Sequence, residues 1–284
     1  MSPAKKEKPS RPKSTGQSAK KEPKTTWREE ASNLGQHLFK YDLDKQARFA
    51  DRLVDICYNA QGKDFLLIHN PGGWGTTRLK NCLQWERSIV EGVNDTIKKL
   101  GYSCYLLQYF RTGDGWREIM RDIREQLRFF ATKSPVLASE LQFITRQFNN
   151  INVVMVGVSQ GAAFSNAVLQ NEVALDRVYS IELGMPFLYE SRQVATERTL
   201  AVKGNGLMPD ALMEWDIITI IKTYFSAPFR WVKYRLEGRP TTFARCINVP
   251  GHDYNWEYPE VQRQVEDFLR INFGNNSSME VGIS

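Results

Sequence analysis

The strongest constraint on the fold of this chain is an alternation that runs from about residue 63 to residue 273. Short runs of large apolar and β-branched residues are followed by longer segments whose apolar residues recur every three or four positions. The first pattern predicts buried strands and the second predicts amphipathic helices. We expect strands at 65–68, 103–110, 153–156, 178–183, 199–202 and 243–249, and helices at 85–100, 116–130, 137–148, 161–170 and 258–273.

This alternation predicts an α/β fold with a mostly parallel central sheet and helices on both faces. Right-handed crossovers leave the carboxyl ends of the strands along one edge, where such sheets bind ligands. Residues 27–60 are expected to be helical and to pack on the sheet. Residues 185–198 and 207–240 are less regular and rich in large apolar residues, so a small cap would lie within them.

The excess positive charge is confined to the N-terminus. The chain has 38 Lys and Arg against 32 Asp and Glu, a net charge of +6, and residues 1–26 hold eight of the basic residues and two of the acidic ones. The remaining chain is neutral and gives no argument for binding nucleic acid or a membrane. Because residues 1–26 offer almost no apolar surface, we expect a disordered tail there, a folded domain over 27–274 and a second disordered tail at 275–284.

The lack of a recognisable targeting signal and the spacing of the cysteines favour a cytoplasmic protein. No segment approaches the length of about 18 apolar residues that a membrane span needs, and the N-terminus lacks the apolar run of a secretion signal. The four cysteines show neither zinc-ligand spacing nor the density of a disulfide scaffold, so reduced thiols and no metal are expected. The basic tail is expected to be a solubilising or linker segment, and contact with an anionic surface is the alternative.

The most specific motif is the segment 153–163. A β-branched run leads into Gly157-Val158-Ser159-Gln160-Gly161 and then into small residues. A nucleophile on so sharp a strand-to-helix turn needs small residues two positions before and after it, because both positions approach neighbouring backbone. The turn exposes the Ser159 hydroxyl and leaves the Gln160 amide at a helix N-terminus, where it can donate to an oxyanion.

A nucleophilic serine needs a base, and the chain has three histidines. His252 follows the last predicted strand and precedes the last helix, so it can reach a serine at the same sheet edge; we predict that it is the base. His69 ends the first strand and is expected to orient the following loop by hydrogen bonding. His37 has no chemical context and is expected to be structural or exposed.

The loop after the first strand reads Asn70-Pro71-Gly72-Gly73-Trp74. Its glycine-rich backbone can approach a carbonyl oxygen, and Pro71 has no N–H to donate. The second oxyanion donor is therefore expected to be the amide of Gly72 or Gly73, with Trp74 lining the substrate pocket. Four further aromatic residues are candidates either for an apolar acyl pocket or for helix-to-sheet packing: Trp215, Phe225, Phe229 and Trp231.

In combination, these motifs resemble the α/β-hydrolase superfamily over residues 63–273. The resemblance rests on 69–73 in place of the family's H-G-type oxyanion loop, on 157–161 as the nucleophile elbow, and on the order of Ser159 and His252 along the chain. It implies a serine hydrolase that cleaves a small acyl ester or thioester without a cofactor. The glutamine after the serine is similar to carboxylesterase and acyl-thioesterase branches.

The acid of the triad is where the sequence departs from the family pattern. The family usually places an aspartate soon after the strand predicted here at 199–202, and the spacing puts Asn205 near that position. Asp210 comes three to five residues late, and its other reading is a helix N-cap. A carboxylate after the preceding strand would be Glu182 or Glu190. Because a carboxylate stabilises the imidazolium whereas an amide only orients the ring, Asp210 is the first choice.

The doubtful acid leaves a second function open, that of a catalytically silent binding or scaffold protein with the same fold. A third has the basic tail acting at nucleic acid or an anionic membrane.

Overall fold

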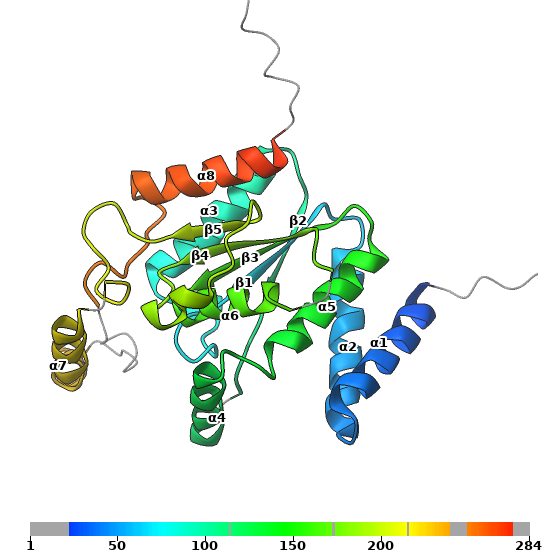
Figure 1. Ribbon diagram of the computed structural model, residues 1–284, viewed down its shortest axis with the longest axis horizontal. Helices are drawn as coiled ribbons and strands as arrows, with labels where there is room; N and C mark the ends of the chain where they lie inside the picture. The colour runs from blue at the N-terminus through cyan, green and yellow to red at the C-terminus, as the bar shows by residue number, and fades with distance from the viewer. Residues whose placement is uncertain (1–22, 114, 172–173, 215, 239–248, 275–284) are drawn as a thin grey trace, which may run out of the picture. The chain divides into compact units, whose positions relative to one another are not determined.

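A computed structural model describes residues 23–113, 115–171, 174–214, 216–238 and 249–274 (Figure 1). The chain divides into two compact units, residues 1–54 and 55–284. The first holds helix α1 (Pro23–Phe39) and most of helix α2 (Leu43–Ala60). The helical character expected for 27–60 is confirmed. Helix α1 begins at Pro23, inside the segment expected to be disordered, and the packing of this region on the sheet stays a prediction.

The second unit is built on five parallel strands in the order β2-β1-β3-β4-β5. The predicted α/β class with a parallel sheet is therefore confirmed, and the strand bounds lie within two residues of those expected. The strands are β1 (Phe65–Asn70), β2 (Cys104–Gln108), β3 (Asn152–Val158), β4 (Val178–Leu183) and β5 (Thr199–Val202). Of the strand expected at 243–249, all but Val249 lies outside the described residues.

Helices cover both faces of this sheet. Figure 1 shows α3 (Gln84–Lys99) and α8 (Pro259–Phe273) on one face, with α5 (Ser134–Gln147) and α6 (Gln160–Leu169) on the other. On the α3 side, Phe65 meets Phe273 edge to face with ring centroids 4.8 Å apart. The strands β1 and β3 are buried along nearly their whole length. This is why they read as continuous apolar runs rather than alternating ones.

Helix α4 (Trp116–Leu127) ends three residues earlier than its apolar spacing predicts. Phe129 and Phe130 take left-handed backbone conformations, with φ of 54° and 56°, and these break the helix. The turn brings Phe130 into the core, where its ring lies edge to face with Phe164 of α6 at 5.3 Å. Burial of one aromatic ring therefore overrides the helical spacing of the sequence.

The two segments expected to hold cap elements contain η2 (Phe187–Arg192), a 3-10 helix, and α7 (Ile217–Leu236). Phe225 and Phe229 of α7 are 75% and 78% exposed, so neither lines a buried acyl pocket. Trp215 and the side chain of Trp231 lie outside what the structure describes. Among the described helices, none has the length and apolar character needed to cross a membrane.

The strand register places several predicted site residues at one edge of the sheet. Asn70 of β1 pairs with Gly157 of β3, and Gly157 pairs with Glu182 of β4. Because these strands are parallel, their carboxyl ends meet at one level. The segments that follow them, including Ser159, therefore start side by side.

Candidate active site

Ser159 stands alone between the last residue of β3 and the first residue of α6, with φ 52° and ψ −119°. Such backbone is strained for any residue other than glycine and costs about 1–3 kcal/mol. Three backbone hydrogen bonds hold it. The Ser159 N–H donates to the Leu183 carbonyl at 2.8 Å, and the Ser159 carbonyl accepts from Ala162 and Ala163 at 2.9 and 3.1 Å. The predicted sharp strand-to-helix turn is thus present.

The two glycines around Ser159 are required sterically. A Cβ on Gly157 would lie 2.5 Å from the carbonyl oxygen of Gly161. A Cβ on Gly161 would overlap the carbonyl oxygen of Asn70 at the end of β1. The close backbone approach that the sequence motif predicts is therefore found at both positions.

His252 pairs with the buried carboxylate of Asp210. Its Nδ1 lies 2.7 Å from Oδ2 of Asp210, which also accepts a hydrogen bond from the Tyr254 hydroxyl at 2.6 Å. The other oxygen accepts from the Leu212 N–H at 2.9 Å. Burial by itself raises the pKa of Asp210, but the hydrogen bonds from His252 and Tyr254 outweigh it and hold the pKa below its ordinary value. Asp210 is therefore ionised at neutral pH and fixes the imidazole from one side.

Two local features bring Asp210 to His252, although Asp210 comes later in the sequence than the usual acid position. The side-chain oxygen of Asn205 accepts from the N–H groups of Leu207 and Met208, which winds the extra residues into a compact turn. Gly251, at φ 76°, packs so closely that a Cβ would overlap the carbonyl oxygen of Pro209. The backbone of the segment before Asp210 therefore packs directly against the backbone of the segment before His252.

The other acid candidates have different partners. Asn205 donates through Nδ2 to Oδ1 of Asp253 at 3.0 Å. Glu182 is buried within β4, where its carboxyl accepts from Asn166 and Ser180. Glu190 is exposed and pairs with Lys203 at 2.8 Å. Of the four candidates, the structure brings Asp210 to His252.

The second imidazole nitrogen, Nε2 of His252, has no protein hydrogen-bond partner among the described residues. The Cε1 atom beside it lies 2.8 Å from where a Cβ on Gly184 would stand. Gly184 follows Leu183, whose carbonyl holds the Ser159 N–H. The imidazole thus lies against the segment that supports the serine turn, with one nitrogen unpaired.

The glycine loop after β1 lies next to the serine. A Cβ on Gly72 would stand 3.9 Å from Cβ of Ser159. The Gly72 N–H already donates to Oε1 of Glu86 at 3.1 Å, which makes it a poor candidate for the second oxyanion donor. Within the described chain, Gly73 N–H has no protein partner, and Gln160 opens α6, where helix amides lack intrahelical acceptors. Trp74 follows in the loop and is 41% exposed.

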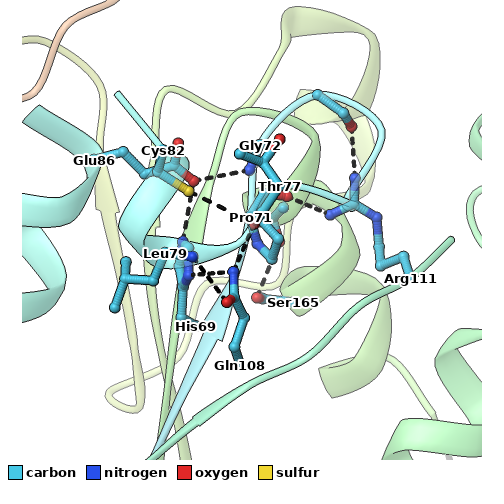
Figure 2. A network of polar contacts seen from close by, with 12 residues as sticks. His69, Pro71, Gly72, Thr77, Leu79, Cys82, Glu86, Gln108, Arg111 and Ser165 are labelled. Carbon is cyan, nitrogen blue, oxygen red and sulfur yellow. Dashed lines mark hydrogen bonds and ion pairs between the residues drawn. The ribbon is translucent and has the colours of Figure 1, made fainter. Parts of the chain in front are cut away.

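His69 uses both ring nitrogens (Figure 2). Its Nε2 lies 3.0 Å from Oε1 of Glu86, and its Nδ1 lies 3.3 Å from Nε2 of Gln108. The Gln108 amide is oriented by Leu79 N–H, which donates to its oxygen, and by the Thr77 carbonyl, which accepts from its nitrogen. Gln108 therefore donates to Nδ1, which assigns the His69 proton to Nε2. His69 thus reaches the loop only through Glu86 and Gln108, which bond loop residues themselves, while His37 is exposed on α1.

One group of described residues has the atom types of a metal site. Potential ligand atoms of His69, Cys82 and Glu86 lie within 4.8 Å of one another, and all three residues are buried. However, His69 Nε2 carries a proton directed at Glu86, and the Cys82 thiol points to the Thr77 carbonyl at 3.7 Å. These hydrogen bonds account for the cluster as a brace beneath the glycine loop.

Three residues at the carboxyl edge of the sheet were not identified from the sequence. Tyr254 supports Asp210, Glu86 holds His69 and Gly72, and Arg111 donates to the carbonyls of Pro71 and Gly73 at 2.6 Å each. Tyr254 lies two residues after the predicted base, which is the one signal that pointed to it. Glu86 reads as an ordinary acidic residue in the first turn of a helix, and nothing near Arg111 in sequence marks it.

No protein-family model matches this chain, and no curated protein matches it. Among solved structures, it is similar to a Trichoderma reesei cutinase in complex with a phosphonate inhibitor, with a TM-score of 0.42 and 12% identity over 86% of this chain and 99% of that one. It is also similar to a cutinase-like protein from Cryptococcus sp., with a TM-score of 0.39 and 13% identity over 74% and 95%.

Proposed function

We propose that this protein is a serine hydrolase that cleaves a carboxylic ester or thioester through an acyl-enzyme on Ser159. His252 acts as the general base and Asp210 as the acid that orients it. One observation carries the proposal. His252 is fixed through Nδ1 by a buried carboxylate, its Nε2 has no partner among the described residues, and its ring lies against Gly184, which follows the residue whose carbonyl holds the strained Ser159. This is the arrangement that a nucleophile, a base and an orienting acid require.

In the proposed reaction, Oγ of Ser159 attacks the substrate carbonyl carbon while Nε2 of His252 takes the serine proton. Asp210 keeps the proton on Nδ1 and stabilises the imidazolium that forms. The tetrahedral intermediate collapses when the bond to the alcohol or thiol breaks, and the leaving group takes the proton from His252. Water then attacks the acyl-enzyme, with His252 again acting as base, and Ser159 is regenerated with release of the acid.

The oxyanion of both tetrahedral intermediates is proposed to bind two backbone amides, those of Gln160 and Gly73. The Gln160 amide lies at the N-terminus of α6, where the helix dipole also favours negative charge. The Gly72 amide, which sequence reasoning offered as an equal alternative to Gly73, is engaged by Glu86. Trp74, partly exposed on the same loop, is proposed to contact the substrate.

The silent scaffold reading rested on the doubtful acid alone. The 2.7 Å contact between Asp210 and His252 removes much of that support and favours the enzyme. A small acyl substrate and a cytoplasmic location belong to the same proposal.

The experiment is hydrolysis of p-nitrophenyl esters and acyl thioesters of increasing chain length by the full-length protein and by Ser159→Ala. We expect the variant to lose at least about 10³-fold in kcat/KM, because both covalent steps pass through Ser159. Ser103→Ala is the matched control, since Ser103 lies before β2 at the opposite edge and bonds Asp64. Hydrolysis by Ser159→Ala at the wild-type rate would refute the proposal.

A further inference from the structure

The most buried cation of the described structure that the proposed mechanism leaves unused is Arg111. Its guanidinium is enclosed and donates from Nη1 to the carbonyl of Pro71 and from Nη2 to the carbonyl of Gly73, each at 2.6 Å (Figure 2). Within the described ranges it forms no ion pair. A guanidinium removed from water without a carboxylate partner is costly. The two loop carbonyls that it holds explain why the guanidinium is buried at this position.

The peptide between Pro71 and Gly72 is fixed at both ends. Its carbonyl accepts from Arg111, and its N–H donates to Glu86 at 3.1 Å. The described peptide bonds are all trans, so the C=O and N–H of one unit point in opposite directions. The guanidinium of Arg111 and the carboxylate of Glu86 thus hold the same peptide unit from opposite sides.

The next peptide units set the direction of the Gly73 N–H. The Gly72 carbonyl accepts from Gly75 N–H at 3.1 Å, and the Gly73 carbonyl is held by Arg111. Gly73 lies between these held units with φ 55°, a conformation that glycine adopts readily. Its amide is therefore set by contacts on both sides, and Arg111 supplies two of them.

The fold delivers Arg111 to this loop by strand order. Because β2 lies beside β1, the residues after β2 run beside those after β1, and Arg111 N–H donates to the Gly75 carbonyl at 3.2 Å. A Cβ on Gly75 would stand 2.8 Å from Cζ of Arg111, so glycine makes room for the guanidinium. The rings of Phe130 and Phe164 lie 5.6 Å from the same Cζ. Burial lowers the pKa of Arg111 to about 10, so it is still protonated at neutral pH.

We propose that Arg111 and Glu86 are positioning residues that clamp the glycine loop so that the Gly73 amide meets the oxyanion, an inference that rests on the proposed function. Neither side chain touches the substrate. Both act through the backbone units that they hold. Their loss should therefore weaken binding of the tetrahedral intermediate more than binding of the substrate.

The test compares Arg111→Lys with Arg177→Lys in the full-length protein. Arg177 makes the same kind of contact away from the site. It lies just before β4, at the amino edge of the strands, and donates to the carbonyls of Thr145, Phe148 and Ile151. Each variant is measured for kcat and KM on p-nitrophenyl butyrate, for inhibition by a trifluoromethyl ketone, which forms an oxyanion when a serine adds to it, and for Tm.

We expect Arg111→Lys to lower kcat by about 10 to 10²-fold and to weaken the ketone by a similar factor, with KM within about threefold of wild type. Arg177→Lys should lower Tm and leave kcat and ketone affinity unchanged. For Glu86, the Gln variant keeps an acceptor oxygen and should retain most activity, whereas Glu86→Leu should lose kcat and ketone affinity together. This pair decides the matter if Arg111→Lys does not fold.

Wild-type kcat and ketone affinity in Arg111→Lys, or equal losses in Arg177→Lys, would overturn the clamp while leaving the proposed hydrolase intact. Equal activity of the two Glu86 variants would overturn it as well. A wild-type protein without Ser159-dependent turnover would instead overturn the proposed function, and the clamp with it.

Discussion

Two histidine–carboxylate pairs lie at the carboxyl edge of the sheet, and they differ in whether the second ring nitrogen is paired. His252 meets Asp210 at 2.7 Å, and His69 meets Glu86 at 3.0 Å. The remaining nitrogen of His69 is occupied by Gln108, and its side chain is fully buried. The remaining nitrogen of His252 has no protein partner in the described chain, and its side chain is 12% exposed. The same two residue types therefore make a brace in one place and a poised base in the other.

The difference originates in where each histidine sits. His69 belongs to a central strand, and the parallel register places Gln108 of β2 directly opposite it. The His69 side chain is therefore enclosed, with a hydrogen-bond partner at each ring nitrogen. His252 lies on a loop after Gly251, where Asp210 holds one ring nitrogen and the rings of Trp85 and Tyr254 pack edge to face against the imidazole, so part of the ring stays accessible. Position in the sheet, rather than the nature of the carboxylate, separates the two roles.

The largest expected effect comes from replacing each histidine by glutamine. His252→Gln should lower kcat/KM by at least about 10⁴-fold, because no group remains to take the Ser159 proton. His69→Gln should mainly lower the free energy of unfolding, by about 1–3 kcal/mol, through an unsatisfied buried partner. The measurements are steady-state hydrolysis of a p-nitrophenyl ester and urea unfolding. If the activity losses were reversed between the two variants, the assignment of base and brace would be wrong.

A smaller effect separates two buried carboxyls, Asp210 and Glu182. Asp210→Asn should lower kcat by about 10²- to 10³-fold, since an amide does not stabilise the imidazolium. Glu182→Gln should leave kcat near wild type, because Glu182 bonds Asn166 and Ser180 rather than a histidine. A comparable loss of kcat in Glu182→Gln would return Glu182 to the list of acids.

The stabilities of the same two variants should depend on pH with opposite signs. Burial raises the pKa of Glu182 to about 7, against the hydrogen bonds that lower it, so the folded state favours the neutral carboxyl. That contribution is full below the unfolded pKa of about 4.5 and is lost as pH rises through 7. Glu182→Gln should therefore gain on wild type between pH 5 and 8, by about 3 kcal/mol at most. The lowered pKa of Asp210 gives stability that is present at neutral pH and lost in acid.

Features set by local sequence could be predicted from the chain alone. The β-branched runs predicted the strands because buried parallel strands are apolar throughout, and Gly157 and Gly161 predicted the serine turn because only small residues fit there. The late acid was harder to assign, since the spacing to Asp210 depends on how the turn at Asn205 winds.

Residues that act through long-range contacts were not predictable. Arg111 is 40 positions from Pro71 in sequence, and only the order of β2 and β1 in the sheet places them together. Glu86 was missed because an acidic residue in a first helical turn is common and its reach to the Gly72 amide depends on how α3 packs. Gly72 and Gly73, equal in sequence, differ because Glu86 holds one of them.

Fluorophosphonate labelling of the full-length protein with peptide mass mapping shows whether Ser159 is a nucleophile that depends on His252. We expect one adduct on Ser159 in the wild type, a much slower reaction in His252→Gln, and an unchanged rate in Ser103→Ala. An unlabelled Ser159 in folded wild-type protein, or equal labelling of Ser159→Ala, would refute the assignment of Ser159 as the nucleophile.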